Sequence, residues 1–209
     1  MQVQNNKEEV PFAHYVDKFR ALDPRDAVTR CGVTFENGEF AVTLLGTTYL
    51  LAWPDYAIRA ETGAGFALEN LPCQTFLLRF LLEGRKAERM TGFKTFREMP
   101  WGEMYIGPYT GRCLTRAAFA FGTRIDAFAQ ACRRMGAREV PHGDAGFEFD
   151  FLGGYRMQII IYAGDDEFAP SSQILYSDNF ASGFAAEDRV VAGDILISAI
   201  QRQIKQKVR

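Results

Sequence analysis

The sequence has few of the residues on which common hydrolytic and metal sites depend. Its 209 residues include two histidines, His14 and His142, and four widely separated cysteines. It contains no G-x-S-x-G elbow, no H-E-x-x-H and no C-x-x-C pair. A Ser–His triad, a zinc ribbon and a locally encoded iron–sulfur cluster are therefore disfavoured. Reduced, buried thiols are the preferred interpretation, whereas a cysteine nucleophile paired with one histidine stays open.

Long apolar runs and a strong excess of one charge are also missing. No run has the length of a membrane span, and the start, MQVQNNKEEV, lacks the apolar core of a signal peptide. The net charge is −2 and the pI is about 5.8. We therefore expect a cytoplasmic protein that binds neither nucleic acid nor a membrane. The polar start predicts a disordered lead over residues 1–10, and the length predicts a single domain over residues 11–209.

The charges that are present are unevenly distributed. Residues 79–138 contain 12 Lys or Arg against 5 Asp or Glu, whereas residues 157–188 contain no basic residue. The basic middle and the acidic C-terminal part are expected to face each other, or to face partners of opposite charge.

Periodicity predicts helices and strands in alternating groups. Helices are expected over residues 12–22, 24–31, 71–82, 110–121, 123–135 and 187–205. A meander of three antiparallel strands is expected over residues 33–53, with a fourth strand near 56–60. Asp23 and Gly32 have the residue types that begin and end a short helix, and Thr123 and Asp126 have capping-box spacing. The glycine-bearing stretch 62–65 lacks the lysine of a phosphate-binding loop, so we interpret it as a turn.

The strongest hairpin signal lies near the C-terminus. Phenylalanines alternate with Glu148, Asp150 and Leu152, then Gly153-Gly154 precedes an isoleucine-rich run over residues 155–162. A Gly-Gly pair supplies the positive φ angles of a two-residue turn. The predicted fold is α+β: a mostly antiparallel sheet, made of the N-terminal meander and the C-terminal hairpin, packed against several helices. Whether the two halves form one sheet or two is open.

An acidic stretch follows the hairpin and offers the first candidate site. Asp165, Glu167 and Asp178 flank a short apolar strand without a nearby basic residue. One interpretation is that they cap turns in solvent. The other is that they converge at strand ends and bind a divalent cation or arginines from elsewhere.

A second candidate lies in the segment 93–112, where aromatic and basic residues alternate. This segment is expected to be loop-rich, and its Trp101, Tyr109 and Arg112 have the chemistry to stack on and clamp a planar anion. The alternative is a hydrophobic cover over the core, with the arginines in water. A pocket between this segment and the acidic loop 164–178 would unite the two candidates.

The C-terminal half resembles a known family in its spacing of acidic and apolar residues. Gly164, Asp165, Glu167 and Phe168 precede an apolar strand, then Asp178 and an acidic helix start at Glu187-Asp188. This pattern is similar to the bacterial and archaeal family called domain of unknown function 3786. The resemblance spans roughly residues 12–205 and implies an anaerobe's protein, in the setting of corrinoid-dependent one-carbon metabolism. Some relatives carry an iron–sulfur module that this sequence lacks. The resemblance supplies no catalytic residue.

Three functions remain open from the sequence. The preferred one is a non-catalytic accessory module that binds a small molecule or a partner protein. The second is a divalent-metal-dependent hydrolase or transferase that uses Asp165, Glu167 and Asp178. The third is a structural role, for example in a homo-oligomer. Neither a cofactor nor a metal is specified by the pattern.

Overall fold

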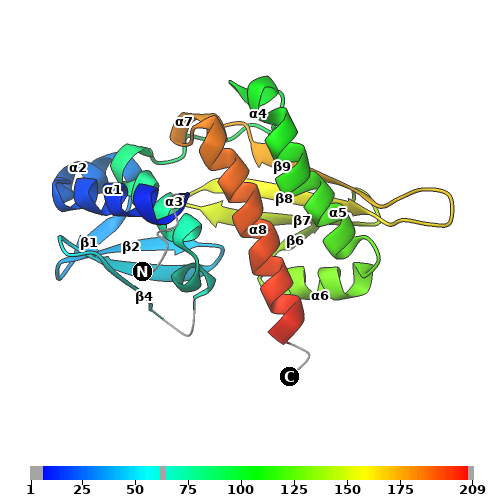
Figure 1. The fold of residues 1–209 in the computed structure, drawn as a ribbon, viewed down its shortest axis with the longest axis horizontal. Coiled ribbons are helices and arrows are strands. Elements are labelled where there is room, and N and C mark those ends of the chain that lie inside the picture. The colour runs from blue at the N-terminus through cyan, green and yellow to red at the C-terminus, as the bar shows by residue number, and fades with distance from the viewer. Residues whose placement is uncertain (1–6, 62–64, 207–209) are drawn as a thin grey trace.

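The fold is built on one antiparallel sheet (Figure 1). The computed structural model describes residues 7–61 and 65–206, and within them nine strands form a single sheet in the order β4-β3-β2-β7-β8-β9-β5, with β1 beside β2 and β6 beside β7. The strands are β1 (Thr34–Glu36), β2 (Glu39–Leu44), β3 (Thr47–Ala52), β4 (Ala57–Ala60), β5 (Phe93–Thr95), β6 (Arg138–Val140), β7 (Ala145–Leu152), β8 (Tyr155–Tyr162) and β9 (Ser171–Ser177). Every strand pair among the described residues is antiparallel. The predicted α+β class is confirmed.

Helices cover this sheet in two groups. They are α1 (Glu9–Arg20), α2 (Pro24–Cys31), α3 (Leu71–Glu83), α4 (Gly102–Tyr109), α5 (Arg116–Phe121), α6 (Ile125–Arg134), α7 (Phe180–Gly183) and α8 (Ala186–Gln206), with a 3-10 turn η1 (Phe66–Glu69). In Figure 1, α1, α2 and α3 lie beside the N-terminal meander, whereas α8 and the α4–α5 helix cross the same face of β7, β8 and β9. Within the described ranges, no helix combines the length and the hydropathy that spanning a bilayer requires.

The two predicted hairpins form with the expected turns. Asn37 and Gly38 have φ angles of 53° and 81°, and Gly153 and Gly154 have 54° and 92°. Such paired positive φ angles suit the twist of a two-residue hairpin.

The two halves of the sheet meet at a narrow junction. β2 pairs with β7 through Leu44 and Leu152, and Leu45 N–H donates to the Phe151 carbonyl at 2.8 Å. One continuous sheet therefore forms, which answers the question that the sequence left open.

The predicted helix boundaries at the N-terminus need one adjustment. The α2 helix begins as expected, because the Asp23 carboxylate accepts from Arg25 N–H at 2.9 Å, and it ends at Gly32 with φ 69°. The α1 helix begins at Glu9, so Glu9 and Val10 of the predicted lead are helical. Residues 1–6 of that lead, and residues 62–64 of the glycine-bearing turn, lie outside the described residues.

The segment predicted to be loop-rich contains more helix than expected. The helix predicted from Thr110 begins instead at Gly102 and continues from α4 through a π-helical segment, η2 (Thr110–Thr115), into α5. Pro108 lies inside it and has no N–H to donate, and the wider η2 turn follows directly. The predicted capping box is also wrong: α6 begins at Ile125, after Arg124, and no side chain caps it.

One aromatic cluster joins α3, the hairpin and the start of α8. Phe184 stacks on Phe76 and Phe80 with ring centroids 5.1 and 5.6 Å apart, and Phe180 packs on Tyr155 and Phe184.

All four cysteines are buried and free, as predicted. Burial raises the pKa of these thiols, that of Cys31 to about 11.

Ion pairs link the basic middle of the chain to its acidic C-terminal part. Arg112 lies 2.9 Å from Asp194, Arg116 also pairs with Asp194, and Arg138 pairs with Glu148. Within the stretch 157–188 that lacks basic residues, Glu187 and Asp188 face Arg79, whereas Asp165 and Asp178 accept from backbone N–H groups, so the two regions face each other only at the start of α8.

Candidate functional site

The acidic stretch does not form a site. Asp165 Oδ1 accepts from the N–H groups of Glu167 and Phe168 at 2.9 and 2.7 Å, which closes a local turn before β9. These N–H groups lower the pKa of Asp165 below its ordinary value, because they stabilise the charged form. The solvated-turn interpretation is the correct one here.

Asp178 lies at the other end of β9. It accepts from the Thr91 N–H at 3.0 Å and from the Thr91 hydroxyl, which lowers the pKa of Asp178. Seven residues of extended strand separate the two loops, or roughly 20 Å at about 3.3 Å per residue, and Figure 1 shows the β8–β9 loop at the opposite end of the sheet from α7.

The predicted metal site is therefore wrong. Asp165 and Glu167 cannot share a coordination sphere with Asp178, because β9 holds their loops apart. Across the described residues, no group of three or more His, Cys, Asp or Glu side chains is placed to hold a metal ion.

The three candidates from the aromatic segment have different positions. Tyr109 is 2% exposed and stacks on Phe96, with ring centroids 4.1 Å apart and the planes within 10°. Its burial raises its pKa, and its hydroxyl donates to the Ile174 carbonyl at 3.4 Å. Tyr109 is therefore part of the core, as the cover interpretation predicted. Arg112 is half-exposed and pairs with Asp194.

Trp101 is the candidate that faces solvent. Its side chain is 70% exposed, and its backbone is left-handed, with φ 63°, immediately before α4. Gly102 makes this tight corner possible: a Cβ there would lie 2.1 Å from the Phe96 carbonyl oxygen. A large aromatic side chain gains little stability from this position, and the backbone conformation costs about 1 kcal/mol. Trp101 therefore presents its indole to solvent in a backbone conformation that its side chain does not favour.

Trp101 lies at a cleft of about 400 Å³, which we call the α8 cleft. Its walls come from the end of α3, from Pro100-Trp101, from the turn 181–186 and from the first turn of α8. The charged lining residues are Arg79, Glu83, Asp188 and Arg189. The aromatic segment thus forms a pocket with the region around residue 185, not with the loop 164–178 as predicted.

Arg189 is the most deeply buried charge in the cleft wall. The residue is 1% exposed, and its guanidinium donates to the carbonyls of Phe184, at 3.3 Å, and Pro100. Its Nε has no hydrogen-bond partner, and none of the ion pairs found among the described residues includes Arg189. Burial lowers the pKa of Arg189, because the charged form is poorly solvated there. Arg189 thus fixes the corner before Trp101 and lies 5.7 Å from the Phe96 ring centroid, while its buried charge has no carboxylate partner among the described residues.

Arg79 is the second arginine of the cleft. Its Nε lies 3.1 Å from Asp188 Oδ1, an ion-pair distance, but the geometry is not that of a hydrogen bond. Its other nitrogens lie 3.7 Å from Glu187 and 3.9 Å from Glu83, and its guanidinium lies 5.5 Å from the Tyr15 ring centroid. Arg79 thus lies within ion-pair distance of three carboxylates, but its Nε forms no hydrogen bond with any of them.

Asp188 completes this group of charges. It is 7% exposed, and its Oδ2 accepts from the Ala185 N–H at 3.2 Å, which caps the start of α8. Burial raises the pKa of Asp188 to about 6, although the Arg79 guanidinium opposes this shift. Its carboxylate therefore changes charge close to neutral pH.

A second cleft of about 460 Å³ lies against the other side of the same ion pair. It is also lined by Arg79 and Asp188, and in addition by Tyr15 of α1 and Arg112 of η2. Arg79 and Asp188 therefore form the wall that the two clefts share.

The sequence interpretation missed Arg79 and Arg189 as site residues. A signal for Arg79 was present, because it is the only charged residue within LPCQTFLLRFLL. Arg189 follows directly on the acidic pair that begins α8, but nothing in that pattern indicates that its side chain is buried.

Replacing Trp101 by asparagine is expected to raise the free energy of unfolding by roughly 0.5–1 kcal/mol, because asparagine tolerates the left-handed backbone better than tryptophan. Urea denaturation measures this change. The matched control is Phe119→Asn on α5, where a side chain 63% exposed is replaced in a right-handed helix. The free energy of unfolding of Phe119→Asn should fall by about 0.5 kcal/mol or less. A loss of stability in Trp101→Asn would show that the indole has a structural role.

Comparison with known protein families gives a match over most of the chain. The model of a family described as "Domain of unknown function (DUF3786)" matches residues 23–199. No curated protein and no solved structure matches the chain.

Proposed function

The chain belongs to the family described as "Domain of unknown function (DUF3786)", and since that description gives no activity, we propose a function from the geometry of the chain itself. The protein is a non-catalytic module that binds a small anionic molecule in the α8 cleft. The cytoplasmic location and the setting of anaerobic corrinoid-dependent one-carbon metabolism stay predictions from the sequence and from the family resemblance.

One observation carries this proposal. Among the described residues, two buried side-chain polar atoms lack a hydrogen-bond partner, and they are the Nε atoms of Arg79 and Arg189. Both arginines line the α8 cleft. Native proteins rarely leave buried donors unpaired, and an unpaired buried charge is costly. A carboxylate, sulfonate or phosphate group is the chemistry that would satisfy two guanidinium groups together.

The remaining walls of the cleft suggest the rest of the ligand. Trp101 offers an exposed aromatic surface beside Pro100, and the cleft volume of about 400 Å³ lies in the range of small-molecule sites. We infer a molecule with an anionic head near the arginines and a flat apolar portion against the indole.

Binding is favoured over catalysis because the reactive groups in the cleft already have partners. The Ser182 hydroxyl donates to the Asn179 carbonyl at 2.7 Å, and Asp188 accepts from the backbone and pairs with Arg79. The metal-dependent alternative has lost its predicted ligands, since β9 separates Asp165 from Asp178.

Benzenesulfonate is a suitable probe, because it combines a permanent anion with a flat ring. We expect saturable quenching of tryptophan fluorescence, which the two tryptophans of the chain make simple to assign, and a matching signal in isothermal titration calorimetry. Arg79→Gln and Trp101→Asn should each weaken binding about tenfold or more, a change of about 1.4 kcal/mol. Arg59→Gln is the control, because it removes an arginine that pairs with Glu39 on the meander.

Equal affinities in the wild type, Arg79→Gln and Trp101→Asn would contradict the proposed site. If Arg79→Gln does not fold, Trp101→Asn still tests the site, because the indole is exposed and its replacement leaves the core intact.

A further inference from the structure

We propose that Asp188 is the internal counter-ion which a bound anion replaces on Arg79, so that binding in the α8 cleft is coupled to the uptake of one proton by Asp188. This inference rests on the proposed function and makes it more specific. It assigns Asp188 as a residue that determines which acids the cleft accepts.

In this geometry, a bound anion and the Asp188 carboxylate compete for the same cation, the Arg79 guanidinium. Arg79 Nε is buried and lies 3.1 Å from Asp188 Oδ1, whereas 18% of the Arg79 side chain stays exposed and can meet a ligand in the cleft. An oxyanion that binds the exposed part of the Arg79 side chain from within the cleft therefore lies close to the Asp188 carboxylate. Two negative groups so close cannot both stay ionised in a poorly solvated wall.

The other groups around Asp188 do not relieve this repulsion. The α3 helix contributes Arg79 and Glu83, and α8 contributes Glu187 next to Asp188; both glutamates raise the pKa of Asp188. Arg189 on α8 lies within electrostatic range of Asp188, but its charge is directed to two backbone carbonyls.

Two further groups lie on the side of the second cleft. Tyr15 of α1 is coupled electrostatically to Asp188 but stays neutral, because burial raises its pKa. Arg112 of η2 is already paired with Asp194. Arg79 is therefore the cation that balances Asp188.

The proton taken up on binding is expected on Oδ1 of Asp188. Oδ2 already accepts from the Ala185 N–H, whereas Oδ1 faces Arg79, and Asp188 lines the cleft. A proton on Oδ1 removes the repulsion and converts the carboxylate into a donor that can bond the ligand oxyanion. The overall change is the binding of an anion and one proton, so a weak acid can supply both. The pKa of free Asp188, about 6, makes this uptake measurable at neutral pH.

Calorimetry with benzenesulfonate in two buffers of different ionisation enthalpy tests the coupling, since the probe itself does not titrate. At pH 7 we expect close to one proton to be taken up per bound molecule, and near pH 5 almost none. Above the pKa of free Asp188, affinity should fall by up to tenfold per pH unit. In Asp188→Asn, proton uptake and this pH dependence should both disappear.

Glu187→Gln is the matched control, because it removes a neighbouring carboxylate that also faces Arg79 but is 66% exposed. It should keep the proton uptake of the wild type. Binding without proton uptake at pH 7, or uptake that persists in Asp188→Asn, would overturn the coupling and leave the site intact. If benzenesulfonate fails to bind at every pH, the proposed function and this inference fall together. Should Asp188→Asn not fold, the proton count of the wild type and of Glu187→Gln decides.

Discussion

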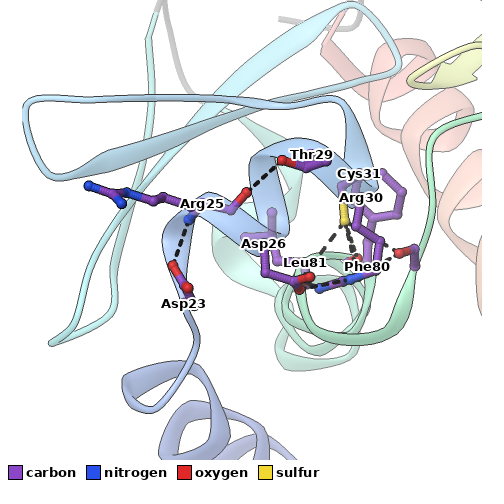
Figure 2. A network of polar contacts seen from close by, with 9 residues as sticks. Asp23, Arg25, Asp26, Thr29, Arg30, Cys31, Phe80 and Leu81 are labelled. Carbon is purple, nitrogen blue, oxygen red and sulfur yellow. Dashed lines mark hydrogen bonds and ion pairs between the residues drawn. The ribbon is translucent and has the colours of Figure 1, made fainter.

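Replacing Arg30 by methionine is expected to lower the free energy of unfolding by about 3 kcal/mol, because hydrogen bonds from a charged group contribute about 1.5–3 kcal/mol each when partly buried. Figure 2 shows Arg30 and Cys31 of α2 directed at the last turn of α3. The Arg30 guanidinium donates to the carbonyls of Leu81, at 2.8 Å, and Gly84, at 2.5 Å, and Cys31 Sγ donates to the Phe80 carbonyl at 3.1 Å. Asp26 Oδ2 holds the guanidinium from the other side at 3.0 Å.

Arg25→Met is the control within the same helix. In Figure 2 the Arg25 side chain extends away from the network, and the hydrogen bonds drawn to Arg25 use its backbone N–H and carbonyl. Its replacement should change stability by about 0.5 kcal/mol or less. Urea denaturation of both variants gives the comparison, and equal losses would mean that Arg30 does not cap α3.

This cap also affects the proposed site. The orphan carbonyls at a helix C-terminus need partners, and α2 supplies them to α3. The same turn of α3 places Glu83 and Gly84 in the wall of the α8 cleft. A contact at the N-terminal end of the chain thereby fixes one side of a site whose other side is α8.

Asp188→Asn should change how stability depends on pH. In the folded protein the pKa of Asp188 is raised from 3.8 to about 6, so between these values the folded state binds more protons than the unfolded state. The free energy of unfolding contributed by Asp188 therefore falls as pH rises through this window. A shift of about two pKa units corresponds to about 3 kcal/mol.

The measurement is the difference between wild type and Asp188→Asn in urea denaturation at pH 4, 5, 6 and 7. Subtraction matters, because the lowered pKa values of Asp165 and Asp178 give the opposite slope in both proteins. We expect asparagine to accept from the Ala185 N–H as Asp188 does. A wild-type advantage that stays constant with pH would refute the assigned titration.

Much of the fold was predictable because it depends on local chemistry. The turn glycines, the Asp23 cap and the alternating phenylalanines of β7 each specify their structure within a few residues. The helix from Gly102 was missed because Pro108 and Gly107 are typical of loops. Tertiary packing overrides that preference: Tyr109 stacks on Phe96 and draws the segment onto the core.

The site was harder to predict, because it depends on contacts between distant residues. Trp101 was identified from its own chemistry, whereas Arg79 and Arg189 acquire their meaning only when α3 meets α8, more than one hundred residues later in the chain. The acidic candidates failed for the converse reason. Asp165, Glu167 and Asp178 are close in sequence, but a strand of seven residues directs their loops to opposite ends of the sheet.

The α8 cleft lies beside the narrow junction between the two halves of the sheet, and this position matters for how the halves are held together. The meander and the C-terminal strands are joined by the single Leu44–Leu152 pairing, so the helices above must carry most of the resistance to bending between them. Arg79 lies on α3, which is beside the meander in Figure 1, and Arg189 lies on α8, which crosses the strands of the hairpin. A molecule bound by both arginines, as proposed above, would therefore add a second link between α3 and α8 beside the aromatic cluster of Phe76, Phe80 and Phe184.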